Sequence, residues 1–178
     1  MARSTLAAAY GPQMIPKRAM ASKHSIRPAT LADIDKIMEI EKQSFSDPWQ
    51  RRSMTSLIGD SRVFFSVAEA VGGVIKGYVT AWFVLNEGEI GNLAVAPQWR
   101  ASGVGSSLLD GVISHSADHG IRILFLEVRQ SNVAARRLYS SRGFVEIGRR
   151  SRYYRRPVED AIVLRRSINL IEIKDIVK

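Results

Sequence analysis

The chain has 178 residues, of which 46% are hydrophobic and 24% are charged. This balance is close to that of an average globular protein, and the length suits about one domain. Cysteine is absent, which excludes disulfide bonds, thiolate metal sites and a cysteine nucleophile. A chain without thiols is compatible with the reducing cytoplasm, where we expect this protein. No apolar run approaches the ~18 residues that a membrane-spanning helix needs, so no membrane association is expected.

The chain is strongly basic. Its 26 lysines and arginines against 17 acidic residues give a formal net charge of +9. Such an excess favours anionic ligands, either nucleic acid or a phosphorylated small molecule. Five arginines lie within residues 149–156, and we interpret this run as a solvated loop ahead of the last strand. A nucleic-acid contact is the alternative interpretation of the same run.

Hydrophobic periodicity and turn residues predict a mixture of strands and helices. Thr30 followed by Asp33 is typical of a helix start, Pro48 prevents the helix from continuing, and Asn132 is typical of a helix N-cap. The segment Asn86-Glu87-Gly88 lies where a hairpin turn is expected. The predicted strands are near residues 25–27 and over residues 63–69, 74–85, 89–95, 121–128, 144–147 and 160–164, and the predicted helices cover residues 30–43, 50–58, 103–119 and 132–141.

These elements define one predicted domain over residues 24–167. Residues 1–23 show no sustained periodicity, and their apolar stretch is too short for a signal peptide, so a flexible tail is expected. Residues 168–178 fit either a strand or a second tail, and we assign them as a tail. His115 and His119 are one helical turn apart, a spacing that can bind zinc, but no third ligand accompanies them. We therefore expect an exposed polar helix face there and no metal.

A glycine-containing junction between a strand and a helix lies at residues 100–105. Backbone N–H groups at a helix start have no intrahelical partner, and the helix dipole adds partial positive charge there. Gly103 and Gly105 lack the Cβ atoms that would keep a pyrophosphate away from the backbone. Neither a Walker loop nor a dinucleotide fingerprint is present. A plain strand–turn–helix connection is the alternative.

Two segments together resemble the GNAT acetyltransferase superfamily. Residues 92–105, Asn-Leu-Ala-Val-Ala-Pro-Gln-Trp-Arg-Ala-Ser-Gly-Val-Gly, resemble its acetyl-coenzyme A motif, (Arg or Gln)-x-x-Gly-x-(Gly or Ala) after a strand. Residues 126–135 and 138–144 are similar to the second half of the same domain. The combination is most similar to the bacterial ribosomal-protein-alanine N-acetyltransferases, the RimI type, over roughly residues 25–167. The resemblance implies an α/β (α+β) GNAT fold, whose mixed, mostly antiparallel sheet has one splayed parallel strand pair and flanking helices.

The same resemblance implies acetyl-CoA as co-substrate, bound between two strands that end near Val95 and Glu127. Backbone groups of Leu93 and Val95 would hold the pantetheine arm and polarise the acetyl carbonyl, and the backbone of residues 100–106 would take the pyrophosphate. Ala101 and Ser106 stand where many relatives have a basic or polar residue, which implies weaker coenzyme binding. The expected coenzyme-binding residues are Leu93, Ala94, Val95, Arg100, Ala101, Ser102, Gly103, Val104, Gly105, Ser106, Asn132 and Tyr139.

Two residues are the expected catalytic groups. An α-ammonium group, with a pKa near 8, must lose a proton before it attacks a thioester. Glu127, at a strand end, is the expected general base, acting directly or through one water. Tyr139, about two helical turns after Asn132 and on the same helix face, is the expected general acid for the departing thiolate. The alternatives are that Glu127 only pairs with Arg129 or Arg152, and that Tyr139 is a packing residue.

By resemblance, the acceptor peptide contacts the loop containing Phe45, Pro48 and Trp49, and the tyrosine pair Tyr153 and Tyr154. These aromatic residues would form the walls of a slot for a small first residue; local packing is the alternative for the loop. The implied acceptor is a protein N-terminus, the first alanine of a ribosomal protein, with nucleic acid met only indirectly through the ribosome. Alternatives are a small-molecule amine or a lysine side chain as acceptor, and a non-catalytic coenzyme-sensing or RNA-docking module.

Overall fold

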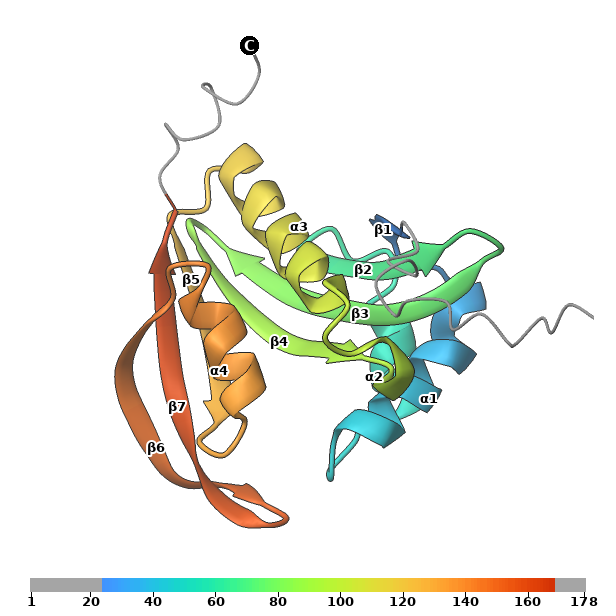
Figure 1. Ribbon diagram of the computed structural model, residues 1–178. Coiled ribbons are helices and arrows are strands. Elements are labelled where there is room, and N and C mark those ends of the chain that lie inside the picture. Colours follow the sequence, from blue (N-terminus) through green and yellow to red (C-terminus); the bar gives the residue numbers. More distant parts are fainter. Residues whose placement is uncertain (1–23, 169–178) are drawn as a thin grey trace, which may run out of the picture.

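The protein was analysed as a computed structural model that describes residues 24–168 (Figure 1). The predicted tails, residues 1–23 and 169–178, therefore lie outside the described residues. The strands are β1 (His24–Pro28), β2 (Val63–Ala70), β3 (Val74–Val84), β4 (Glu87–Val95), β5 (Ile123–Arg129), β6 (Val145–Arg155) and β7 (Val158–Ser167). The helices are α1 (Ile34–Ser44), α2 (Arg51–Ser56), α3 (Val104–Asp118) and α4 (Val133–Ser140), with short 3₁₀ turns η2 (Leu31–Asp33) and η3 (Pro97–Trp99).

The strands form one sheet in the order β1-β2-β3-β4-β5-β7-β6. All neighbours are antiparallel except β4 and β5. The parallel pairing joins residues 87–90 to residues 123–126 and then stops, although β4 continues to Val95 and β5 to Arg129. The two strands therefore diverge over their C-terminal ends. This arrangement confirms the predicted fold class.

A β-bulge in β4 marks the point of divergence. Gly91 and Asn92 together lie opposite Thr80 of β3, and the Asn92 N–H donates to Thr80 Oγ1 at 3.0 Å. The extra residue reverses the alternation of the side chains, so Ile90 and Ala94 belong to the cores on opposite faces of the sheet. Because bulges bend a strand and increase its twist, β4 turns away from β5 here.

Helices cover both faces of the sheet (Figure 1). On one face, Leu108, Leu109 and Val112 of α3 lie in the core between the helix and the sheet, and α3 packs mainly on β2, β3 and β4. On the other face, α1 and α2 cover the half formed by β2, β3 and β4, with Ile37 and Met54 in the core. No helix within residues 24–168 is long and apolar enough to cross a membrane. Among the described residues, no helix covers the β5–β7–β6 half of the second face.

The predicted turn at residues 86–88 is wrong by two residues. The observed turn is Leu85-Asn86, where Leu85 has a φ of 55°, and both Glu87 and Gly88 belong to β4. A Cβ atom on Gly88 would lie 2.7 Å from side-chain atoms of Leu124 and Phe83. This glycine is thus explained by close packing between strands rather than by turn geometry.

The last two strands are much longer than predicted. The arginines of residues 149–155 lie within β6, not in a solvated loop, and β6 forms a hairpin with β7. Most of β6 is exposed because it is the edge strand of the sheet. An edge strand exposed on both faces has no apolar alternation, so the periodicity that reveals other strands is missing here.

Candidate active site

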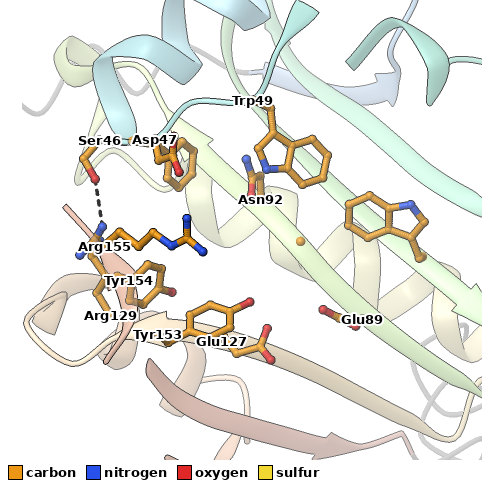
Figure 2. A pocket seen from close by; sticks show the side chains of 13 residues that line it. Ser46, Asp47, Trp49, Glu89, Asn92, Glu127, Arg129, Tyr153, Tyr154 and Arg155 are labelled. Carbon is orange, nitrogen blue, oxygen red and sulfur yellow. Dashed lines mark hydrogen bonds between the residues drawn. The ribbon is translucent and has the colours of Figure 1, made fainter. Parts of the chain in front are cut away.

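The pocket lies where β4 and β5 diverge, on the face that α1 covers (Figure 2). Along β5, Leu124, Leu126 and Val128 face the core under α3, so the side chains of Glu127 and Arg129 point to the opposite face. The pocket has a volume of about 640 Å³. Its lining residues are Phe45, Ser46, Asp47, Trp49, Trp82, Glu89, Gly91, Asn92, Glu127, Arg129, Tyr153, Tyr154 and Arg155.

Most of the predicted catalytic and acceptor residues meet in this one pocket. Glu127, Phe45 and Trp49 line it together with the tyrosine pair Tyr153 and Tyr154. Two predicted residues, Pro48 and Tyr139, are not among the lining residues. The pocket thus brings together segments that are about a hundred residues apart in the sequence.

The Glu127 carboxylate is largely buried, with 15% of its side chain exposed. Its ion-pair partner is Arg150, whose Nη2 lies 3.1 Å from Oε1, rather than Arg129 or Arg152. Burial raises the pKa of Glu127 above its ordinary value, the positive charge of Arg150 opposes that rise, and the negative charge of Glu89 adds to it. A carboxylate with a raised pKa is a stronger base than a free one, which suits proton abstraction near neutral pH.

Tyr139 is buried on α4, with its ring edge-on to Phe144 at 5.7 Å. Within residues 24–168 its hydroxyl makes no hydrogen bond. Burial raises the pKa of Tyr139 well above its ordinary value, and the nearby phenol of Tyr154 raises it further. Tyr139 therefore keeps its proton at neutral pH, and it is close to a residue that lines the pocket.

Two tryptophans form an apolar wall that the sequence predicted only in part. The rings of Trp49 and Trp82 lie 5.5 Å apart. Trp82 lies directly over Gly91, where an added Cβ atom would come within 2.0 Å of the indole ring. Trp82 was not predicted, although a glycine inside a strand indicates that another group approaches the backbone closely.

Arg129 connects the two sides of the pocket. Its guanidinium donates to Ser46 Oγ at 2.9 Å, to Glu159 Oε2 at 3.2 Å and to the Arg156 carbonyl at 3.0 Å. It also lies 4.1 Å above the Tyr154 ring. Figure 2 shows this side chain between the loop after α1 and the β6–β7 hairpin. Arg129 thus holds the loop after α1 close to the tyrosine pair, a contact that sequence analysis missed.

The start of α3 has the geometry of an anion site. Ala101 and Gly103 have φ values of 57° and 89°, and the first helical hydrogen bond runs from the Ser107 N–H to the Gly103 carbonyl at 3.0 Å. The N–H groups of residues 104–106 therefore have no intrahelical partner. Apart from its chain neighbours and the nearby backbone of α3, no atom of residues 24–168 lies within 4 Å of the position that a Cβ atom on Gly103 would occupy. The junction is open to a phosphate, and the residues present fit a pyrophosphate.

Gly105 brings the remaining coenzyme-site predictions together. A Cβ atom there would lie 3.4–3.7 Å from side chains of Leu138, Val95 and Leu93, so the end of β4, the start of α3 and the middle of α4 meet at this glycine. The Arg100 Nε donates to the Val95 carbonyl at 3.1 Å. This carbonyl, one of the backbone groups expected to hold the pantetheine arm, therefore already accepts one hydrogen bond. Asn132 caps α4 as predicted.

The evidence for the cap is a hydrogen bond: the Asn132 Oδ1 accepts the Ala135 N–H at 3.1 Å.

The two histidines of α3 pack against each other and against an aromatic ring. The rings of His115 and His119 stack at 3.9 Å, and Phe64 lies 4.9 Å from the His115 ring. In the part of the chain that the structure describes, no three potential metal ligands converge.

The chain belongs to the acetyltransferase (GNAT) family, whose model matches residues 34–144. The resemblance noted in the sequence is thereby confirmed, and the protein is an acetyl-CoA-dependent N-acetyltransferase by family. The chain is 32% identical over 142 residues to the ribosomal protein bS18-alanine N-acetyltransferase of Escherichia coli strain K12, a match that covers 78% of this chain and 93% of the relative.

Two further comparisons agree with this assignment. The enzyme of the same name from Haemophilus influenzae is 33% identical over 135 residues, which cover 74% of this chain and 90% of the relative. The crystal structure of the Escherichia coli ribosomal-protein-S18-alanine N-acetyltransferase superposes with a TM-score of 0.76 at 31% identity. That match covers 83% of this chain and 95% of the solved one.

Proposed function

We propose that the protein transfers the acetyl group of acetyl-CoA to the α-amine of a protein N-terminus, and that the acceptor is a ribosomal protein that begins with alanine. The observation that supports this most directly is the pocket in which Glu127 lies among the aromatic side chains of Trp49, Tyr153 and Tyr154. The relatives named for alanine N-acetylation of bS18 support the choice of acceptor. A ribosomal acceptor implies reaction in the cytoplasm, with nucleic acid met only through the ribosome.

The co-substrate supplies the acetyl group as a thioester. The N–H groups of residues 104–106 and the glycines Gly103 and Gly105 hold its pyrophosphate, because the helix start is open and partially positive. The end of β4, from Leu93 to Val95, adjoins Gly105 and holds the pantetheine arm. This placement directs the thioester into the space between the diverging strands β4 and β5.

Glu127 accepts the proton of the acceptor. The α-ammonium group must become an amine before it attacks, and its ordinary pKa near 8 makes the loss of that proton feasible near neutral pH. Glu127 is positioned on β5 with its carboxylate in the pocket, and burial raises its pKa toward that of the acceptor. The carboxylate takes the proton directly or through one water.

Tyr139 donates a proton to the leaving group. As the new N–C bond forms and the C–S bond breaks, the coenzyme leaves as a thiolate that needs one proton. Burial keeps Tyr139 protonated, and its hydroxyl makes no hydrogen bond within residues 24–168 that would hold that proton. The nitrogen loses two protons in all: the first passes through Glu127 to solvent, and the second, lost as the C–S bond breaks, replaces the proton that Tyr139 gives to the thiolate, so no further reactant is required.

The aromatic walls select the first residue of the acceptor. Trp49, Trp82 and the two tyrosines line the same pocket as the carboxylate and supply its aromatic surface. A small side chain such as that of alanine fits beside the reacting amine, whereas a bulky one would displace an indole ring. A hydrophobic site discriminates by a few kcal/mol at most, so we expect a preference rather than absolute selection.

The test is an acetylation assay with peptides that begin with alanine, serine or methionine, alongside an N-terminally blocked peptide containing lysine and a set of polyamines. We expect transfer to the free alanine peptide and none to the blocked one. Mass spectrometry of N-termini in cells with and without the gene would identify the acceptor. Equal rates with blocked and free peptides would overturn the proposal.

A further inference from the structure

A carboxyl group lies buried behind the acceptor pocket, outside its lining. Glu41 of α1 is 0% exposed, and no ion pair to it forms within residues 24–168. Burying a carboxylate without a cation is unfavourable unless hydrogen bonds replace the lost water. Burial accordingly raises the pKa of Glu41, and the hydrogen bonds that it accepts act against that rise.

The hydrogen-bond donors around Glu41 come from three different elements. The Trp49 N–H, in the loop before α2, donates to Oε1 at 2.8 Å. The Asn92 side-chain amide, at the β4 bulge, lies 3.1 Å from Oε1 and 3.3 Å from Oε2. The Tyr78 hydroxyl of β3 donates to Oε2. One carboxyl group therefore joins a loop, a bulge and a central strand.

Two of these three donors line the acceptor pocket, namely Trp49 and Asn92. Both bind the same oxygen of Glu41, which fixes the loop relative to the bulge. Figure 2 shows these two residues on the side of the pocket opposite Tyr153 and Glu127. Arg129 fixes the other end of the loop through Ser46. The position of the Trp49 indole against Trp82 thus depends on the Glu41 carboxyl, which binds the Trp49 backbone.

We infer that Glu41 is a positioning residue for the acceptor pocket: its buried carboxyl holds the Trp49 backbone against Asn92 and so fixes the wall on which the acceptor N-terminus lies. This inference rests on the proposed function, since it assigns the pocket to the acceptor. Glu41 does not touch the acceptor or the coenzyme. Its effect is preorganisation of the loop, which lowers the entropy lost when a peptide binds.

The test is the Glu41→Gln variant, which keeps the shape of the side chain but replaces one acceptor oxygen with an NH₂ donor. At the Oε1 position this NH₂ group faces the Trp49 N–H, and at the Oε2 position it faces the Asn92 amide, so one of these two donations is lost, whereas the Tyr78 hydroxyl can turn and accept. We expect the KM for an alanine-initiated peptide to rise about tenfold, as expected for one hydrogen bond to a charged group, with the KM for acetyl-CoA unchanged. Amide exchange at Trp49, followed by NMR, should accelerate by a similar factor of about ten.

The control is Ile40→Val, a neighbouring buried residue of α1 that does not line the pocket. It loses core packing and should leave both KM values unchanged. If Ile40→Val reproduces the rise in peptide KM, or if Glu41→Gln raises both KM values together, Glu41 is only a structural residue. If Glu41→Gln does not fold, Tyr78→Phe replaces it, because Tyr78 donates to the same carboxyl and does not line the pocket: the inference then requires a raised peptide KM with faster exchange of the Trp49 amide.

The amide exchange measurement separates this inference from the proposed function. If the wild-type protein acetylates no peptide, the proposed function fails, while exchange at Trp49 in Glu41→Gln still decides whether the carboxyl holds the loop. Unchanged exchange in that variant would overturn the inference even with an active wild-type enzyme. Faster exchange together with a raised peptide KM would establish it.

Discussion

The guanidinium of Arg150 lies 3.1 Å from the carboxylate of Glu127, although the two residues belong to strands that are not neighbours. Glu127 pairs with Val163 of β7 and Arg150 pairs with Ala161, so the ion pair reaches across β7. Arg150 is more than half exposed, whereas Glu127 is largely buried. Glu127, the proposed base, is therefore influenced both by a solvated cation and by the carboxylate of Glu89, which also lines the pocket.

Replacing Arg150 by glutamine should move the acidic limb of the pH–rate profile to higher pH. The positive charge of Arg150 lowers the pKa of Glu127, so its removal raises that pKa further. A general base is active when deprotonated, and activity is lost as the pH falls through its pKa. The measurement is kcat/KM for a peptide acceptor as a function of pH. If the acidic limb stays in place, Arg150 does not influence the ionisation that controls the rate, and the prediction is wrong.

Replacing Glu89 by glutamine should move the same limb in the opposite direction. The negative charge of Glu89 raises the pKa of Glu127, so its removal lowers that pKa and extends activity to lower pH. The two variants introduce the same residue, which controls for the effect of a new amide in the pocket. Shifts of the same sign in the two charge variants would contradict the assignment.

Replacing Glu127 itself by glutamine should remove the acidic limb of the pH–rate profile. Turnover should fall by about 10²-fold, with coenzyme binding preserved.

Replacing Tyr139 by phenylalanine should reduce kcat without unfolding the protein. The ring packs edge-on against Phe144 in the core, and phenylalanine keeps that contact. The hydroxyl makes no hydrogen bond within residues 24–168, so removing it leaves no donor or acceptor among these residues without its partner. We expect a fall in kcat of about 10²-fold, as for loss of a general acid, with little change in Tm. Thermal unfolding and steady-state kinetics on the same preparation test this; a normal kcat would make Tyr139 a packing residue.

The sequence predicted the α3 junction and the α4 cap better than the contacts around the pocket. The α3 junction and the Asn132 cap are encoded by a few neighbouring residues, and local rules therefore identify them. The acceptor side depends on contacts between distant residues: Asn92 meets Glu41 across 51 positions and Arg129 meets Ser46 across 83. No local pattern specifies such pairs. The edge strand β6 was likewise predicted only at its start, because the rest of the strand lacks a buried face.

Replacing Gly91 by alanine should weaken acceptor binding more than coenzyme binding. A Cβ atom at this position would come within 2.0 Å of the Trp82 ring, so the indole must leave its place in the pocket wall. Gly148→Ala in β6 is the matched control, because nothing lies within 4 Å of a Cβ atom there. We expect the peptide KM to rise severalfold in Gly91→Ala alone. Equal effects of the two substitutions would show that the Trp82 position does not matter for the acceptor.

The stability of the fold at low pH should depend on Asp33. Arg27 of β1 donates to Asp33 at 2.7 and 2.9 Å and to Glu69 of β2 at 2.8 and 2.9 Å, which joins β1, β2 and the start of α1. These hydrogen bonds, chiefly those from Arg27, lower the pKa of Asp33 from 3.8 to about 2. The folded state therefore binds fewer protons than the unfolded state in this range.

It follows that the stabilisation from Asp33 is fully present above about pH 4 and is lost as the pH falls toward 2. Asp33→Asn should lower the free energy of unfolding at neutral pH, and its difference from the wild type should shrink between pH 4 and pH 2. Denaturant unfolding across that range measures this. Asp60→Asn is the control: Arg62 also lowers the pKa of Asp60, but solvent screens that surface pair, so the substitution should cost little at any pH. A constant difference between wild type and Asp33→Asn down to pH 2 would show that the Arg27–Asp33 contact does not contribute through ionisation.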